Sequence, residues 1–111
     1  MDRSVLRAYL RRTRFAPGDR NAARADASRI ASFLRAEGAT RVVGIGSAFV
    51  ASRRFTRGSD IDIVVEGLPP RRFFGASARA ADMTAFKLDV TPLESATDYM
   101  RQAAADEGVD L

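Results

Sequence analysis

The run DIDIVV, residues 60–65, constrains the fold of this chain more than any other stretch. Successive side chains of a β-strand point to opposite faces, so Asp60 and Asp62 share one face while the isoleucines beside them share the other. The isoleucines would face a core, and the two carboxylates would converge on the opposite side. Carboxylates this close raise one another's pKa unless a cation lies between them. The run therefore predicts a strand with a cation site at its start, although such a pair alone also occurs at solvated strand ends.

Around this run the sequence alternates between helical and extended patterns. Helical spacing of apolar residues covers 3–13, about Asn21 to Glu37, Pro70 to about Ala81, and a last segment over 95–108, where Ser95 would be the N-cap and Gly108 the stop. Extended patterns cover 40–46 and 85–93. Val109 and Leu111 either add a closing strand or simply pack.

The order of these elements indicates an α/β (α+β) fold, a small mixed β-sheet packed with helices. A chain of 111 residues has room for one modest core. We therefore expect a single domain over 1–111, in which residues 1–20 form an N-terminal helical extension and residues 21–111 form the core.

The composition narrows the chemistry that a carboxylate site could perform. The sequence has no cysteine, which excludes disulfides and thiolate chemistry, and no histidine, which removes the commonest general base. Catalysis in this chain would have to use carboxylates, hydroxyls and cations. A site built from oxygen ligands alone favours Mg²⁺ or Mn²⁺ over zinc.

Two further features point toward phosphate chemistry. Asp89 alternates with apolar residues in the later strand, so it joins Asp60 and Asp62 in one patch if the two strands are neighbours. Three such carboxylates can hold two metal ions, one at a triphosphate and one at an attacking oxygen. Gly46 and Ser47 follow an earlier strand, where a glycine turn and a hydroxyl can hydrogen-bond phosphate oxygens. Each feature is weak alone, but together they indicate phosphoryl or nucleotidyl transfer.

The charge balance favours anionic partners. The formal net charge is +4, and seventeen of the eighteen basic residues are arginine, whose guanidinium suits phosphate groups. The alternative interpretation is that these arginines simply lie on ordinary solvated helix faces. No apolar run approaches the length of a membrane span, and the first residues lack the apolar stretch of a signal peptide. We expect a cytoplasmic protein without membrane contact.

The segment GS, followed by SDIDIVV and by the later KLDVTPLE, resembles the DNA polymerase β-type nucleotidyltransferase superfamily, in particular its smallest branch, the minimal nucleotidyltransferases. The resemblance covers roughly Ala23 to the C-terminus and implies a polymerase β-like fold. It also implies roles for matching residues: phosphate binding by Gly46 and Ser47, metal binding by Asp60 and Asp62, and completion of the second metal site by Asp89, which would assist deprotonation of the attacking hydroxyl. Arg53, Arg57 and Ser59, in the loop before the two aspartates, are further candidates for contacting the nucleotide.

Minimal nucleotidyltransferases are often encoded beside a HEPN-domain protein, act as its antitoxin and in some cases adenylylate it on tyrosine. The resemblance therefore implies Mg²⁺-dependent transfer of AMP from ATP to a hydroxyl of a HEPN-type toxin. A small domain without a separate acceptor-binding region fits an acceptor that is itself a partner protein.

Three alternatives stay open. The chain has Ala51 where such domains usually carry a second glycine, and the gap between Ser47 and Asp60 is about two residues longer than usual, which favours a module that neutralises its partner by occlusion. An arginine-rich nucleic-acid binder is less favoured, because no basic helix interleaved with aromatics is evident. The predicted C-terminal helix and its glycine disfavour the amino-terminal piece of a larger cyclic-nucleotide or oligonucleotide synthase.

Overall fold

A computed structural model describes residues 3, 5, 19–56 and 58–111 of the chain. The predicted helix over 3–13, and with it most of the predicted extension over 1–20, lies outside the described residues. Within the described part, no helix is both long and apolar enough to cross a membrane.

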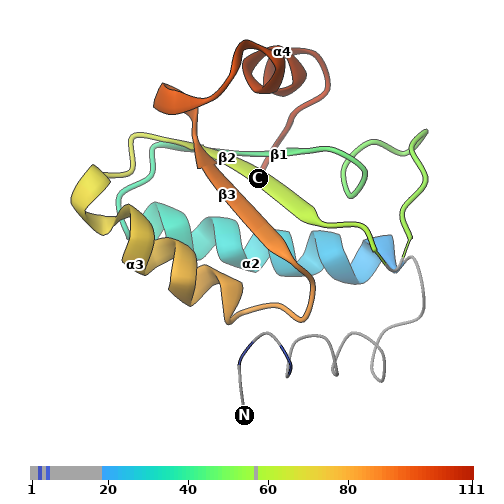
Figure 1. Cartoon of the computed structure of the whole chain (residues 1–111), viewed down its shortest axis with the longest axis horizontal. Coiled ribbons are helices and arrows are strands. Elements are labelled where there is room, and N and C mark those ends of the chain that lie inside the picture. Colours follow the sequence, from blue (N-terminus) through green and yellow to red (C-terminus); the bar gives the residue numbers. More distant parts are fainter. Residues whose placement is uncertain (1–2, 4, 6–18, 57) are drawn as a thin grey trace.

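The described chain forms a four-stranded sheet with helices on both faces (Figure 1). The elements are α2 (Arg20–Ala36), β1 (Arg41–Ile45), β2 (Ile61–Glu66), α3 (Pro70–Ala81), β3 (Leu88–Pro92), the short 3₁₀ helix η1 (Leu93–Ser95), α4 (Asp98–Asp106) and β4 (Val109–Asp110). The strand order is β3-β2-β1-β4, with β1 antiparallel to β2 and β4, and β2 parallel to β3. This mixed sheet confirms the predicted α+β fold, and β4 shows that the closing strand forms.

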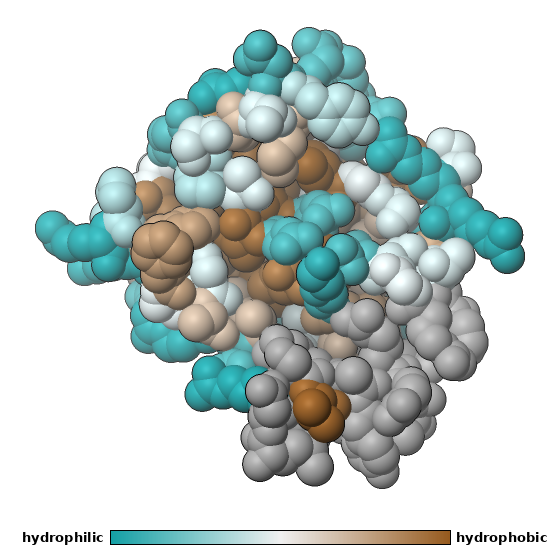
Figure 2. Space-filling view, in the orientation of Figure 1, coloured by the Kyte–Doolittle hydropathy of each residue, from teal (hydrophilic) through white to brown (hydrophobic). Residues whose placement is uncertain are grey.

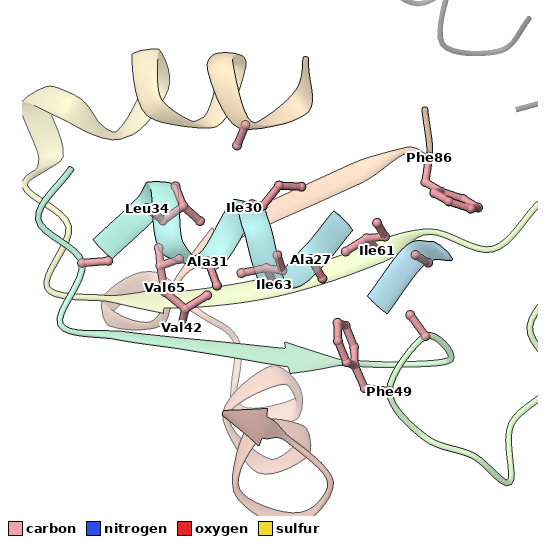
Figure 3. Close-up of a cluster of buried hydrophobic side chains, with 14 of the residues drawn as sticks. Ala27, Ile30, Ala31, Leu34, Val42, Phe49, Ile61, Ile63, Val65 and Phe86 are labelled. Carbon is pink, nitrogen blue, oxygen red and sulfur yellow. The ribbon is translucent and has the colours of Figure 1, made fainter. Parts of the chain in front are cut away.

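Helix α2 covers one face of the sheet because its apolar residues recur at helical spacing. Ala23, Ala27, Ile30 and Leu34 are all fully buried, as the sequence pattern predicted. They pack against Ile61, Ile63 and Val65 of β2, as Figure 3 shows. The helix begins one residue earlier than predicted, because the Asp19 side chain accepts a hydrogen bond from the backbone N–H of Ala22 at 2.9 Å and acts as N-cap. This packing fixes which face of β2 is left for the aspartates.

Helix α4 covers only part of the sheet face that lies opposite α2. Val43, Ile45 and Val64 form a second small core with Ala104 of α4. Asp62 lies opposite Ile45 in the β1–β2 register, two pairs beyond the pair of Val43 and Val64, toward the start of β2. Figure 2 shows hydrophilic residues mainly around the outline of this view, and hydrophobic residues toward its middle and over α3.

The prediction of Ser95 as the N-cap of the last helix was wrong. The chain first completes the 3₁₀ turn η1, which ends at Ser95. The side chain of Thr97 then accepts a hydrogen bond from the backbone N–H of Met100 at 3.2 Å, so Thr97 is the N-cap of α4. Serine and threonine both serve as N-caps, and the preceding turn places Thr97 at that position.

Candidate functional site

The parallel pairing of β2 with β3 brings three carboxylates together. Asp62 and Asp89 are direct partners in the strand register, and Asp60 immediately precedes β2. One oxygen from each of the three side chains lies within 4.8 Å of the others. Ile61 and Ile63 are buried on the other face, so the alternation expected from the sequence holds. The structure thus gathers all three predicted acids at the start of β2.

This cluster carries an electrostatic cost that a cation would relieve. The pKa of Asp62 is raised to about 6, first by burial and then by the negative charges of Asp89 and Asp60. All three ligands offer carboxylate oxygens, the donors that Mg²⁺ and Mn²⁺ prefer. The residues present therefore fit a divalent cation of this type.

The turn after β1 touches the cluster from the side of β1. Gly46 has φ of +83°, a left-handed conformation that favours glycine. A β-carbon at Gly46 would stand 3.1 Å from Oδ2 of Asp62. The backbone N–H groups of Phe49 and Val50 both donate to the carbonyl oxygen of Gly46, at 3.0 and 3.1 Å, which closes a tight turn around Ser47. The predicted phosphate turn and the predicted metal ligands are therefore direct neighbours.

Arg20, at the first position of α2, holds this turn and the loop that follows it. Its Nε donates to the carbonyl oxygen of Ser47 at 3.1 Å, and its other nitrogens donate to the carbonyls of Ala51 and Arg53. The guanidinium also lies over the ring of Phe55, 6.0 Å from its centroid. Sequence reasoning missed this residue, because a contact across 27 residues leaves no local pattern.

The predicted contacts from the loop have other partners in this structure. Arg53 forms an ion pair with Glu107 just after α4, at 2.8 Å. The hydroxyl of Ser59 accepts a hydrogen bond from the backbone N–H of Thr56 at 2.9 Å, which shapes the turn before Asp60. Arg57 lies outside the described residues.

Ala51 does not require the backbone that only glycine adopts. Among the described residues, every positive φ belongs to a glycine, so Ala51 has a conformation open to any residue. Its side chain is exposed. The loop therefore accommodates alanine in place of the usual second glycine.

The cluster also has a cationic neighbour that the sequence analysis did not assign to the site. Nζ of Lys87 lies 3.7 Å from Oδ2 of Asp60. The only signal in the sequence was that Lys87 is the one lysine of the chain and lies two positions before Asp89.

The fold is that of known toxin-antitoxin structures, among them an MntA-HpeT structure and a HEPN toxin in complex with an MNT antitoxin. No protein-family model matches the sequence, and no curated protein matches it. The chain is similar to one from the crystal structure of an MntA-HpeT toxin-antitoxin mutant in which two aspartates, two positions apart, are replaced by glutamate. That match has a TM-score of 0.63 at 20% identity and covers 76% of this chain and 70% of that chain.

Two further solved structures show the same likeness. One is a tri-AMPylated Shewanella oneidensis HEPN toxin in complex with its MNT antitoxin, with a TM-score of 0.59 at 19% identity, covering 79% of this chain and 70% of that chain. The other is a toxin-antitoxin structure with AMP-PNP, with a TM-score of 0.62 at 22% identity, covering 76% of this chain and 70% of that chain. At these identities the likeness establishes the fold.

Proposed function

We propose that this chain is a metal-dependent nucleotidyltransferase that transfers AMP from ATP to a hydroxyl group of a HEPN-type partner protein, and that it acts as the antitoxin of that partner. The observation that carries the proposal is the meeting of three carboxylates, within 4.8 Å of one another, directly against the glycine turn at Gly46. Carboxylates for a cation and a backbone turn for phosphate are the two parts that such a transfer needs.

Each part of the site has a role in this reaction. Asp60, Asp62 and Asp89 would hold Mg²⁺ or Mn²⁺, which would neutralise the triphosphate and acidify the attacking hydroxyl. Gly46 lets the backbone approach the phosphates, and Ser47 with the amides of its turn donates hydrogen bonds to their oxygens. Asp89, the exposed member of the cluster, receives the proton of the acceptor hydroxyl.

The bonds and charges balance without a further reactant. The acceptor oxygen forms a bond to the α-phosphorus, the bond from that phosphorus to the bridging oxygen breaks, and pyrophosphate leaves. The known structures support this choice of nucleotide and acceptor, since one contains AMP-PNP and another an AMPylated HEPN toxin with its MNT antitoxin.

The experiment that tests the proposal is transfer of label from α-labelled ATP. The protein is incubated with Mg²⁺, labelled ATP and a HEPN-type protein encoded beside its gene, and label on the partner is measured. Asp60→Asn and Asp62→Asn should each abolish labelling, because they remove a ligand charge and keep the side-chain size. Asp106→Asn, an exposed position on α4, is the matched control and should label normally. Label that persists in both site variants would refute the proposal.

A second candidate is neutralisation of the partner by occlusion, without transfer. The observation that favours it is the ion pair of Arg53 with Glu107, which occupies a loop residue expected to contact the triphosphate. If the chain acts by occlusion, the Asp60→Asn and Asp62→Asn variants would still rescue cells that express the HEPN-type toxin. If it acts by AMP transfer, rescue would be lost together with labelling.

A further inference from the structure

Lys87 is the only lysine in a chain with seventeen arginines, and it lies beside the carboxylate cluster. Its Nζ is 3.7 Å from Oδ2 of Asp60, and its side chain keeps 64% of its surface exposed. An exposed pair of this kind is weak and exchanges readily with solvent ions. Lysine also carries its charge on a flexible stem, unlike the planar fork of arginine. The one lysine of the chain is therefore placed at its acid cluster.

Lys87 approaches the cluster from the side opposite the glycine turn. Gly46 follows β1 and stands against Asp62, whereas Lys87 precedes β3, which pairs with the other edge of β2. The carbonyl oxygen of Lys87 accepts a hydrogen bond from the backbone N–H of Ile61 at 2.9 Å, which fixes this segment beside the start of β2. The cluster thus lies between a phosphate turn on one side and Lys87 on the other.

The exposed member of the acid cluster, Asp89, lies on the side of Lys87. In the described sheet, β3 is an edge strand. Asp89, which is exposed, and Lys87, which is exposed, are two positions apart on this edge. An acceptor hydroxyl that gives its proton to Asp89 would therefore come near the ammonium group of Lys87, two positions away in the chain.

We propose that Lys87 is a resident counter-cation of the site: it pairs with Asp60 until a divalent cation takes that oxygen, and its ammonium then faces the β3 edge, where it selects acceptors that carry an anionic group beside the hydroxyl. A divalent ion with twice the charge and direct oxygen contact displaces a singly charged ammonium held at 3.7 Å. The released ammonium attracts an anionic acceptor and disfavours a cationic one.

This inference rests on the proposed function, but its first test needs no turnover. Mn²⁺ binding without nucleotide is measured by titration calorimetry and by the loss of the free-ion electron paramagnetic resonance signal. Lys87→Gln should bind Mn²⁺ about three- to tenfold more tightly than the unaltered protein, because a competing positive charge is gone. Lys87→Arg should bind within about twofold of the unaltered protein, because the charge remains.

Arg71→Gln is the matched control for the loss of one positive charge. Arg71 is exposed in the first turn of α3, which follows the far end of β2 from Asp60. Its Mn²⁺ affinity should not change. Equal or weaker Mn²⁺ binding by Lys87→Gln, or an equal gain in Arg71→Gln, would overturn the counter-cation role.

The second test separates the acceptor side from the nucleotide side. With saturating Mg²⁺, Lys87→Gln should raise the KM for the HEPN-type acceptor about threefold or more and leave the KM for ATP within twofold, and Lys87→Glu should raise the acceptor KM further. A rise in the KM for ATP instead would place Lys87 on the triphosphate and overturn the acceptor assignment.

The two proposals fail in different ways. If the unaltered protein neither binds Mn²⁺ nor transfers label, the proposed function fails and this inference with it. If the unaltered protein does both and Lys87→Gln behaves identically, only this inference fails.

Discussion

Gly46 stands directly against Asp62, with only 3.1 Å between the Oδ2 atom of Asp62 and the position that a β-carbon of Gly46 would occupy. Two segments that are separate in the sequence, the turn after β1 and the start of β2, are joined by this contact. A side chain at Gly46 would crowd the Asp62 carboxylate, and the φ of +83° there already disfavours one. A phosphate held by the turn would therefore lie beside the carboxylates.

Gly46→Ala should weaken binding of AMP-PNP at least tenfold. The methyl group would press on the Asp62 carboxylate, and the left-handed backbone of an alanine costs about 1–2 kcal/mol. Binding is measured by titration calorimetry with Mg²⁺ present. Gly75→Ala is the control, because a β-carbon there meets nothing within 4 Å, and its nucleotide affinity should not change. Undiminished binding by Gly46→Ala would show that the turn does not hold the nucleotide.

Asp62→Asn should raise the free energy of unfolding at pH 8 by about 1 kcal/mol, a figure reduced for the solvent screening of a half-exposed carboxyl. Burial, together with the negative charges of Asp89 and Asp60, raises the pKa of Asp62 in the folded protein to about 6, above its ordinary value of 3.8. The folded state therefore binds this proton more tightly than the unfolded chain does, and the stability that the proton gives is full below pH 4 and is lost as the pH rises through 6.

The measurement is urea denaturation of both proteins at pH 4, 6 and 8 with EDTA. The advantage of Asp62→Asn should be largest at pH 8 and vanish near pH 4. Mg²⁺ in place of EDTA should stabilise the unaltered protein and shrink the difference. If Asp62→Asn were more stable by the same amount at every pH, the raised pKa of Asp62 could not be the cause of the difference.

Most of the fold could be predicted because its signals are local. The helical spacing of Ala23, Ala27 and Ile30 and the alternation over 60–63 are local signals, and burial bears out both. The start of α4 was misplaced, since Ser95 has Asp98 three residues on and matches the capping-box pattern, but a 3₁₀ turn over Leu93–Ser95 moves the N-cap to Thr97.

The site could be predicted only in part, because its contacts cross between elements. That Asp89 joins Asp62 depends on β3 lying beside β2 in a particular register, which the sequence offers only as a condition. The hydrogen bonds of Arg20 to the turn at Ser47, and the ion pair of Lys87 with Asp60, have no periodicity that reveals them. Interactions of this kind depend on how the elements pack in the folded protein.

Arg20→Lys should weaken AMP-PNP binding about three- to tenfold, although the charge is kept. The guanidinium serves the carbonyls of Ser47, Ala51 and Arg53 at once, and a single ammonium cannot reproduce that fork. Mn²⁺ affinity without nucleotide should stay within twofold, because the carboxylates themselves do not contact Arg20. A parallel loss of Mn²⁺ binding would mean that Arg20 supports the whole site and not the turn alone.

Ala51→Gly should not improve nucleotide binding, even though it restores the glycine usual in such domains. Ala51 is exposed and its φ is not positive, so the turn gains nothing from a glycine. The extra freedom of the unfolded chain should lower the free energy of unfolding by about 0.5–1 kcal/mol. Titration calorimetry with AMP-PNP measures the nucleotide affinity, and urea denaturation measures the free energy of unfolding. A tenfold gain in affinity would show that Ala51 does limit the site.

Thr84→Val should lower the free energy of unfolding by about 1–3 kcal/mol, because it strips a hydrogen bond from a buried carboxylate. The hydroxyl of Thr84 donates to Oδ2 of Asp26 at 2.7 Å and accepts from the backbone N–H of Phe86 at 3.1 Å. Asp26 is only 7% exposed, and its other oxygen accepts from Arg29 at 2.6 Å. These bonds tie α2 to the segment that leads into β3.

Since β3 carries Asp89, the same substitution should also weaken Mn²⁺ binding a few-fold. Thr84→Ser keeps both hydrogen bonds and should recover most of the stability and the Mn²⁺ affinity. Ser28→Ala, which removes an exposed hydroxyl from α2, should change the free energy of unfolding by less than about 0.5 kcal/mol. Urea denaturation and Mn²⁺ titration of the three variants test this, and a Thr84→Val protein as stable as the unaltered one would show that the buried carboxylate of Asp26 does not depend on this donor.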